Sequence, residues 1–191
     1  KKLIDSGARI FGIHKNNSSE SILTLNRIKG YNSISYNTLT SDKLTELISD
    51  KEIEICFHLA AQVEVIKGYE NPYGTFDNNF NLTLMLLESI RLSNTVKSLV
   101  FTSTDKVYGD LDKSKLPYKE NYTPNPETPY EISKYLCEKL CIAYAKNYKI
   151  PIIITRACNI YGPGQLNLSA IIPSLILSAI NGYLTVINYD K

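Results

Sequence analysis

The chain has 191 residues, of which 43% are hydrophobic and 21% are charged. This composition is that of a globular protein and excludes a disordered, collagen-like or low-complexity chain. With 21 Lys and Arg against 19 Asp and Glu, the formal net charge is +2, which predicts no binding to nucleic acid or to an anionic membrane surface. No apolar run reaches the roughly 18 residues of a membrane span, so we expect no membrane partner.

The cysteines and histidines do not predict a metal centre. The four cysteines lie in apolar stretches, at Cys56, Cys137, Cys141 and Cys158. A metal pair at Cys137 and Cys141 would need two more clustered ligands, and His14 and His58 are the only histidines. Buried, reduced thiols are the favoured interpretation, and they indicate a reducing, cytoplasmic compartment.

Strands alternate with helices along the chain. Strands are predicted at residues 8–14, 33–36, 53–58, 96–102, 150–155 and 184–187, helices at 40–49, 72–93, 129–148 and 169–180, and polar loops at 15–30 and 109–128. Gly7 ends a preceding helix, Thr40 or Ser41 caps the next one, and Asn71 with Pro72 starts the longest. Because the inner strands are apolar runs, we predict an α/β fold with a doubly wound parallel sheet covered by helices on both faces.

In such sheets ligands bind beyond the carboxyl ends of the strands. The residues that follow the strands at 8–14 and 53–58 are candidates for such a binding site. The basic pair His14-Lys15 follows the first strand; it either lies near a ribose 2′-phosphate or is a solvent-exposed strand end. The small residues of Leu59-Ala60-Ala61-Gln62 follow His58. They either let a flat ligand approach the backbone or serve packing alone.

Groups that can carry out acid–base chemistry follow the next strand. Thr104, Asp105 and Lys106 place a hydroxyl, a carboxyl and an amine in a row, where one group can donate a proton and its neighbour accept one. The alternative is a turn with a surface ion pair. On the following helix, Tyr130 and Lys134 share a face at i, i+4 spacing. A cation beside a phenol lowers its pKa, so Tyr130 is either a base tuned by Lys134 or half of an incidental pair.

Five segments together resemble the extended short-chain dehydrogenase/reductase family that acts on nucleotide sugars. They are HLAAQ at 58–62, NPYGTFDNNFNLTLMLLES at 71–89, TSTDKVYG at 102–109, PYEISK at 129–134 and TRACNIYGPG at 155–164. The resemblance implies a Rossmann-like NAD(P)-binding domain at residues 1–165, without its first strand and glycine-rich turn, and the beginning of a sugar-nucleotide-binding domain at 166–191. Since the chain opens at Lys1 without Met, we expect a fragment of a longer protein.

The same resemblance implies roles for single residues. Tyr130 takes the proton of the sugar hydroxyl, Lys134 binds the nicotinamide ribose and tunes Tyr130, and Thr104 hydrogen-bonds the sugar. Asn79 matches an asparagine that orders the active-site backbone, and Asn159 matches one that contacts the substrate. The other residues expected along the cofactor are His14, Asn37, Thr38, Leu59, Ala60, Ala61, Gln62 and Thr102.

The cofactor implied is NAD, with NADP left open. His14 stands where the family has a ribose-binding acid, and Asn37-Thr38 stands where it often has an acid near the adenine. The resemblance also implies a homodimer through the helices at 72–93 and 129–148.

The pair Asp105-Lys106 points to the reaction. It resembles the pair of CDP-glucose 4,6-dehydratases, in which the acid protonates the departing C6 hydroxyl and the base removes the C5 proton, giving a 4-keto-6-deoxy sugar nucleotide. Inverting UDP-N-acetylglucosamine 4,6-dehydratases also carry an Asp-Lys pair, so the nucleotide is less defined than the reaction. The alternatives are a nucleotide-sugar C4-epimerase or related oxidoreductase, which does not need this pair, and a non-catalytic protein that kept the fold.

Overall fold

The computed structural model describes residues 2–15, 30–163, 165, 167–168 and 170–183. It is an α/β structure with parallel strands, as predicted, and the strands of the described residues form two sheets. The chain forms two compact units, one made of residues 39–158 and the other of residues 1–38 together with 159–191. The division at residue 165 expected from the sequence stays a prediction.

The smaller unit contains one sheet of two parallel strands. Its elements are α1 (Lys2–Asp5), β1 (Ile10–His14), β2 (Tyr31–Ser35), a 3-10 turn at Tyr36–Thr38, and α7 (Ile171–Ile180). β1 pairs with β2 so that His14 lies opposite Ser35. Gly7 follows α1 with a φ of +84°, the left-handed backbone that commonly ends a helix at glycine. The strand predicted at 184–187 and most of the loop predicted at 15–30 lie outside the described residues.

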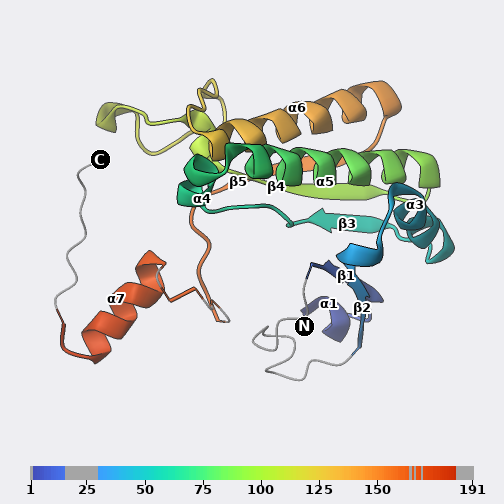
Figure 1. Cartoon of the computed structure of the whole chain (residues 1–191), viewed down its shortest axis with the longest axis horizontal. Coiled ribbons are helices and arrows are strands. Elements are labelled where there is room, and N and C mark those ends of the chain that lie inside the picture. The colour runs from blue at the N-terminus through green and yellow to red at the C-terminus, as the bar shows by residue number, and fades with distance from the viewer. Residues whose placement is uncertain (1, 16–29, 164, 166, 169, 184–191) are drawn as a thin grey trace. The chain divides into compact units, whose positions relative to one another are not determined.

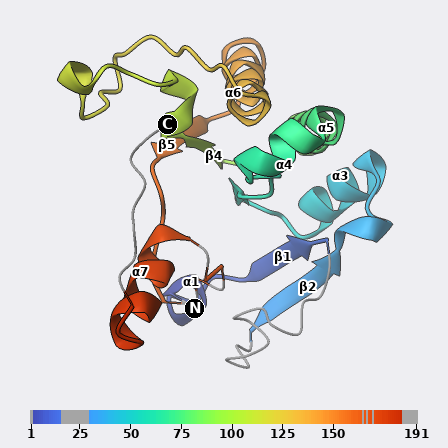
Figure 2. The same cartoon turned by 60° about the vertical axis from the view of Figure 1, so that its left-hand side comes forward.

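The larger unit holds a parallel sheet in the order β3-β4-β5. Its elements are α3 (Ser41–Asp50), β3 (Ile55–His58), α4 (Val65–Glu70), α5 (Pro72–Ser93), β4 (Ser98–Thr104), 3-10 turns η2 (Asp105–Tyr108) and η3 (Lys113–Lys115), α6 (Pro129–Tyr148) and β5 (Ile152–Ala157). Figures 1 and 2 show α5 and α6 side by side over one face of this sheet, and α3 also packs on α5.

The core of the larger unit lies between this sheet face and the helices. Leu99 and Phe101 of β4 are buried with Leu87 of α5 and with Cys137 and Cys141 of α6. Burying one large apolar side chain stabilises the fold by about 1.5–3 kcal/mol. The opposite face of the sheet carries Ile55, Phe57 and Ile153, whose side chains are more than half exposed. The α-helical layer described for this unit therefore covers one face.

Capping residues set the starts of the main helices. The Thr40 hydroxyl accepts from the amide of Lys43, and the Asn71 side chain accepts from the amide of Gly74 at 2.9 Å. Both confirm the predicted caps. α6 begins with a capping box, in which Thr128 and Glu131 bond to each other's backbone, and such a cap stabilises a helix by about 1 kcal/mol.

One helix and several strand boundaries differ from the sequence-based expectation, among them β5, which runs from Ile152 to Ala157 where residues 150–155 were predicted. α4 was not predicted, because it is six residues long, contains Gly68 and lacks a side-chain cap. It forms where Gly68 packs against Tyr130: a methyl group on Gly68 would lie 3.5 Å from the Tyr130 Cβ. β4 runs two residues beyond its predicted end at Thr102, because Ser103 and Thr104 continue the pairing with β5.

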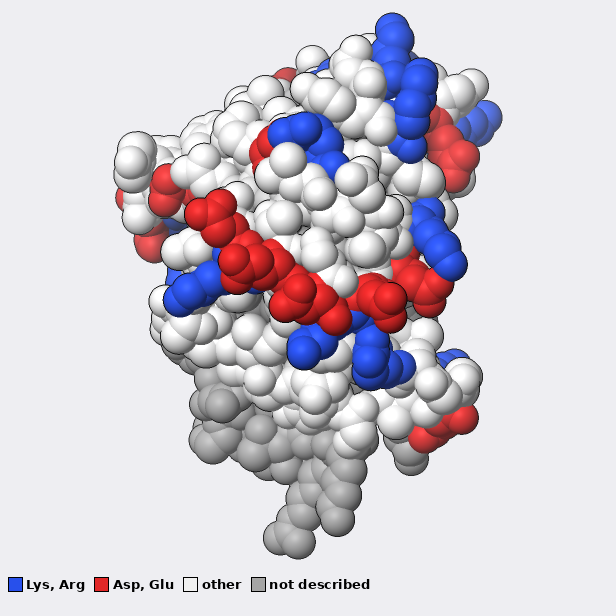
Figure 3. Space-filling model, turned by 90° about the vertical axis from the view of Figure 1, so that its right-hand side faces the viewer, with Lys and Arg blue, Asp and Glu red and all other residues white. Residues whose placement is uncertain are grey.

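The outer face of α3 is acidic. Asp42, Glu46 and Asp50 follow one another at i, i+4 spacing and are exposed. Figure 3, which views the side of the molecule where α3 lies, shows a band of acidic side chains with Lys and Arg beside it. Among the helices of the described residues, none is both long and apolar enough to span a membrane.

Candidate active site

The strands of the larger unit end at one edge, and the predicted acid–base residues gather there. Because β3, β4 and β5 are parallel, their last residues His58, Thr104 and Ala157 share this edge. The chain leaves β3 with exposed residues, since Leu59 is 68% exposed and Ala60 is also exposed. The backbone after β3 is therefore open to a ligand.

Tyr130 lies in the first turn of α6, where the capping box fixes its backbone. Its side chain is only 7% exposed. Burial raises the pKa of the phenol, and the neighbouring Asp105 and Glu131 carboxylates raise it further, while a hydrogen bond with Thr104 lowers it. The structure thus brings Tyr130, Thr104 and Asp105 together, as the sequence analysis expects.

Lys134 lies against β4. Its ammonium group donates to the Thr102 carbonyl at 2.6 Å and lies 4.5 Å above the ring of Phe101. The groups that shift the pKa of Tyr130 are Thr104, Asp105 and Glu131, and the tuning of Tyr130 by Lys134 stays a prediction. The i, i+4 spacing places both side chains on one helix face, but the carbonyl and the ring of β4 hold the amine.

Asn79 ties three segments together beneath the site. Its Nδ2 donates to the Gln62 carbonyl at 3.1 Å and to the Ser133 hydroxyl at 2.9 Å, and its Oδ1 accepts from the Gln62 amide at 2.7 Å. Ser133 in turn donates to the Tyr130 carbonyl at 2.7 Å. One side chain of α5, itself 2% exposed, therefore connects the loop after β3 with the Tyr130 turn of α6.

His58 and Thr83 extend this network, and neither they nor Ser133 were singled out from the sequence. The Thr83 hydroxyl donates to the Asn79 carbonyl at 2.8 Å, so its oxygen accepts from His58 Nε2 at 2.9 Å. Burial, with Lys134 as the second cause, lowers the pKa of His58 to about 4, which keeps the ring neutral. The one signal for Ser133 was its place three residues after Tyr130, on the same helix face.

The turn after β4 carries the expected acid and base. The Thr104 hydroxyl donates to the Asp105 carboxylate at 3.2 Å and accepts from the Lys106 amide at 3.3 Å. Asp105 is half-buried, and Lys106 is exposed. The carboxyl group therefore lies next to the Tyr130 phenol, and the amine follows on the solvent side of the same turn.

The remaining predicted cofactor residues lie in the smaller unit, at the carboxyl ends of its two strands. His14 Nε2 and the Ser33 hydroxyl are 2.5 Å apart. Asn37 donates to the Lys15 carbonyl at 3.3 Å, and Thr38 donates to the Ser35 carbonyl at 2.9 Å. These contacts bring His14, Asn37 and Thr38 to one edge.

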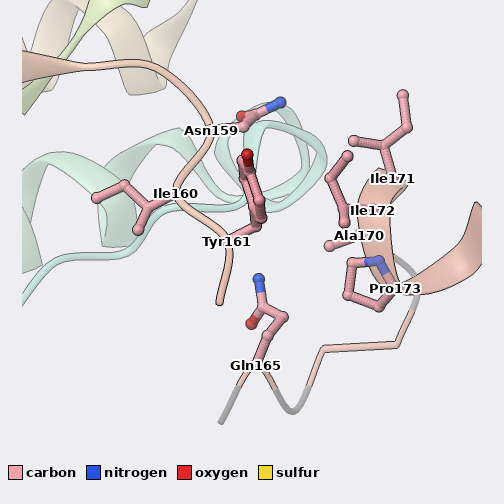
Figure 4. Close-up of a pocket in the computed structure, with 8 residues that line it drawn as sticks. All are labelled: Asn159, Ile160, Tyr161, Gln165, Ala170, Ile171, Ile172 and Pro173. Atoms are coloured by element: carbon pink, nitrogen blue, oxygen red, sulfur yellow. The ribbon is translucent and has the colours of Figure 1, made fainter. Parts of the chain in front are cut away.

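Asn159, the predicted substrate contact, lines a cavity of about 250 Å³ in the smaller unit. The other lining residues are Ile160, Tyr161, Gln165, Ala170, Ile171, Ile172 and Pro173. Figure 4 shows the Asn159 and Tyr161 side chains on the loop and the apolar start of α7 across from them. The walls are mostly apolar and include the side-chain amides of Asn159 and Gln165.

Two polar atoms near the strand edge of the larger unit fit a bound dinucleotide. Gln62 Oε1 and Ser103 Oγ are buried and have no hydrogen-bond partner among the described residues. Buried polar groups are normally paired. Together with the open backbone at Leu59 and Ala60, these atoms make the edge fit the cofactor expected from the sequence.

Comparisons with known proteins show the family of the chain. A family model described as the NAD dependent epimerase/dehydratase family matches residues 1–189. A trifunctional UDP-glucose 4,6-dehydratase, 3,5-epimerase and reductase of Arabidopsis thaliana is 34% identical over 144 residues, which are 75% of this chain and 22% of that protein.

Two solved structures of relatives have a fold similar to that of this chain. The UDP-glucose 4-epimerase of Thermotoga maritima with UDP-glucose has a TM-score of 0.83 at 28% identity, and the match covers 99% of this chain and 60% of that one. The dTDP-glucose 4,6-dehydratase of Bacillus anthracis with NAD has a TM-score of 0.77 at 26% identity and covers 95% and 56%. The chain spans 21–42% of the length of the curated relatives that it matches.

Proposed function

The chain belongs to the NAD-dependent epimerase/dehydratase family, and from this membership we propose that the protein is a nucleotide-sugar 4,6-dehydratase. The observation that carries the proposal is the Thr104-Asp105-Lys106 turn next to the buried Tyr130. A 4,6-dehydratase needs an acid and a base at this place in addition to the phenol, because water must leave across C5 and C6.

Two sets of residues are proposed to hold the cofactor. Leu59–Gln62, Asn79, Thr102 and Lys134 serve the nicotinamide side, and His14, Asn37 and Thr38 serve the adenosine side. NAD is proposed first because the solved dehydratase relative holds it, and the basic His14-Lys15 pair keeps NADP as an alternative. When bound, the cofactor would accept a hydride from the substrate and later return it.

The acid–base work falls to three side chains of this chain. Tyr130 takes the proton from the sugar C4 hydroxyl while the hydride leaves C4, and Thr104 orients that hydroxyl. Lys106 removes the C5 proton, which the new C4 carbonyl has made acidic. Asp105 protonates the C6 hydroxyl, which leaves as water. The returned hydride adds to C6 and a proton to C5, so the product is a 4-keto-6-deoxy sugar nucleotide.

CDP-glucose is the proposed substrate because Asp105-Lys106 resembles the pair of CDP-glucose dehydratases. Asn159 is the proposed sugar-nucleotide contact, supported by its place in a mainly apolar cavity. The relatives compared above are named for UDP- and dTDP-linked sugars, so the test includes all three nucleotides.

A C4-epimerase is the second candidate. The observation that favours it is the similarity to the UDP-glucose 4-epimerase over 99% of this chain. An epimerase also uses the phenol of Tyr130 but does not need Asp105 and Lys106. The two functions therefore differ in what a substitution of Lys106 does.

The test is to incubate the protein and NAD with CDP-, UDP- and dTDP-glucose and to analyse the products by mass spectrometry and NMR. We expect the loss of one water and a 4-keto-6-deoxy product, with CDP-glucose preferred. Tyr130→Phe abolishes the first oxidation, whereas Lys106→Ala still forms reduced cofactor but no dehydrated product. A product of unchanged mass with an inverted C4 contradicts the dehydratase and establishes the epimerase. Inactivity toward the whole panel favours a non-catalytic protein.

Assembly and compartment are proposed on separate grounds. A homodimer through α5 and α6 is supported by the apolar side chains that remain exposed on them, Tyr73, Leu92, Leu136 and Ile142. The four cysteines are free, but only Cys137 and Cys141 are buried as expected, whereas Cys56 is half-buried and Cys158 is exposed. A reducing, cytoplasmic compartment is proposed from the free thiols.

A further inference from the structure

A buried ion pair joins the helix of Tyr130 to the strand next to the acid–base turn. Glu138 of α6 is fully buried, and the Arg156 side chain of β5 is 23% exposed. The guanidinium group binds both carboxylate oxygens, with Nε to Oε1 at 3.0 Å and NH2 to Oε2 at 2.7 Å. Such a bidentate pair fixes direction as well as distance. Glu138 lies one helical turn after Lys134, and Arg156 lies opposite Ser103 in the sheet.

The same arginine also contacts the acid–base turn. Its guanidinium group lies 4.8 Å from the centre of the Tyr108 ring, and Tyr108, which is 3% exposed, is the last residue of η2. A second contact comes from Tyr118, whose ring stacks on Tyr108 with centroids 5.5 Å apart. Tyr118 also donates to the Gly109 carbonyl at 3.2 Å. The end of the turn is therefore contacted by both the arginine and the second tyrosine.

We propose that Glu138 and Arg156 are positioning residues that fix the Asp105-Lys106 turn relative to Tyr130. The catalytic effect of this pair rests on the proposed function, whereas its contacts are observed in the structure. Arg156 bonds to the helix that carries Tyr130 and contacts the ring that ends the turn, so a shift of either element disturbs both contacts. Neither residue needs to touch the substrate.

The test substitutes each partner conservatively in the full-length protein. Arg156→Lys keeps the positive charge but loses the bidentate guanidinium contact with Glu138 and the planar contact with the Tyr108 ring. Glu138→Gln keeps the size of the side chain but removes its negative charge. We expect kcat to fall about 10- to 100-fold, as for a small misplacement of reacting groups, with the KM for the sugar nucleotide unchanged. We also expect faster amide hydrogen exchange at residues 104–109 in both variants.

The matched control is Arg91→Lys. Arg91 also binds a glutamate, Glu88, through two nitrogen atoms and also lies over a tyrosine, with 5.3 Å to the Tyr148 ring, but it contacts no residue of the turn among these partners. We expect wild-type kcat and wild-type exchange at residues 104–109 in this variant.

A third variant separates positioning from stability. Replacing Glu138 and Arg156 together by methionine removes the charges without leaving either one unpaired. Recovery of kcat in this double variant, or wild-type kcat and exchange in Arg156→Lys and Glu138→Gln, overturns the proposal. If the wild-type protein epimerises and does not dehydrate, the proposed function fails, and hydrogen exchange at residues 104–109 tests the pair. If the wild-type protein is inactive, hydrogen exchange at residues 104–109 alone decides whether the pair positions the turn.

Discussion

At the scale of single residues, Tyr130 depends on Thr104 for its acid–base behaviour. Burial raises the pKa of the phenol, and the hydrogen bond with Thr104 lowers it. Thr104→Val removes this hydrogen bond, so the pKa of the Tyr130 phenol rises and the base is available only at higher pH. We expect the acidic limb of kcat/KM to move to higher pH and the maximum to fall about 10- to 100-fold.

The control for this variant is Thr155→Val. Thr155 belongs to the neighbouring strand and donates to the Phe101 carbonyl at 3.4 Å, without acting on Tyr130. Its pH profile should match the wild type. An acidic limb that stays in place in Thr104→Val contradicts the assigned hydrogen bond.

His58 makes stability depend on pH. Its pKa is lowered from 6.5 to about 4 in the folded chain, so between these values the unfolded chain binds more protons. Stability is therefore complete above pH 6.5 and falls as the pH drops through the folded pKa, by about 3 kcal/mol in full. His58→Gln keeps a donor for Thr83 but cannot titrate. Urea unfolding from pH 7 to pH 4.5 should show a smaller loss in this variant, and an unchanged loss contradicts the assignment.

At the scale of elements, Asn79 holds the loop after β3 against α5 and α6. Asn79→Ala leaves the amide and carbonyl of Gln62 without these partners, and an unpaired buried group costs about 1–3 kcal/mol. We expect the free energy of unfolding in urea to fall by about 2 kcal/mol. Asn81→Ala is the control, because Asn81 is exposed and bonds only within its helix, to Asp77 at 2.6 Å. It should change stability by less than about 0.5 kcal/mol; equal losses in both variants contradict the role of Asn79.

The elements with local signals were predictable, and those set by tertiary contacts were not. α5 and α6 begin where Asn71 and Thr128 cap them, because a cap depends on residues three apart. α4 exists through packing on Tyr130, 62 residues after Gly68, which no local pattern encodes.

The same limit applies to the site. The spacing of Tyr130 and Lys134 predicted a shared helix face but not that Thr102 and Phe101 would hold the amine. Glu138 lies four residues after Lys134 on the same helix, but its sequence position alone did not predict that it is buried. Its partner Arg156 is 18 residues away and is recognised only once the strand and the helix are placed together.

At the scale of the whole molecule, two apolar surfaces of the larger unit remain exposed. One is the sheet face with Ile55, Phe57 and Ile153, and the other is the outer side of α5 and α6. Exposed apolar side chains that gather on one surface can mark interaction sites in soluble proteins. The helical surface is the one that the proposed homodimer uses, so it provides the test at this scale.

The proposed dimer is tested by placing charge on the outer side of α6. Leu136 and Ile142 are 40% and 47% exposed, and Leu136→Asp with Ile142→Asp would put two carboxylates into the interface. We expect the dimer dissociation constant, measured by sedimentation, to rise about thirtyfold or more, since losing an interface hot spot costs at least about 2 kcal/mol. Lys146→Glu is the control, because Lys146 is an exposed charged residue at the far end of the same helix. A dimer that survives the double substitution shows that another surface joins the subunits.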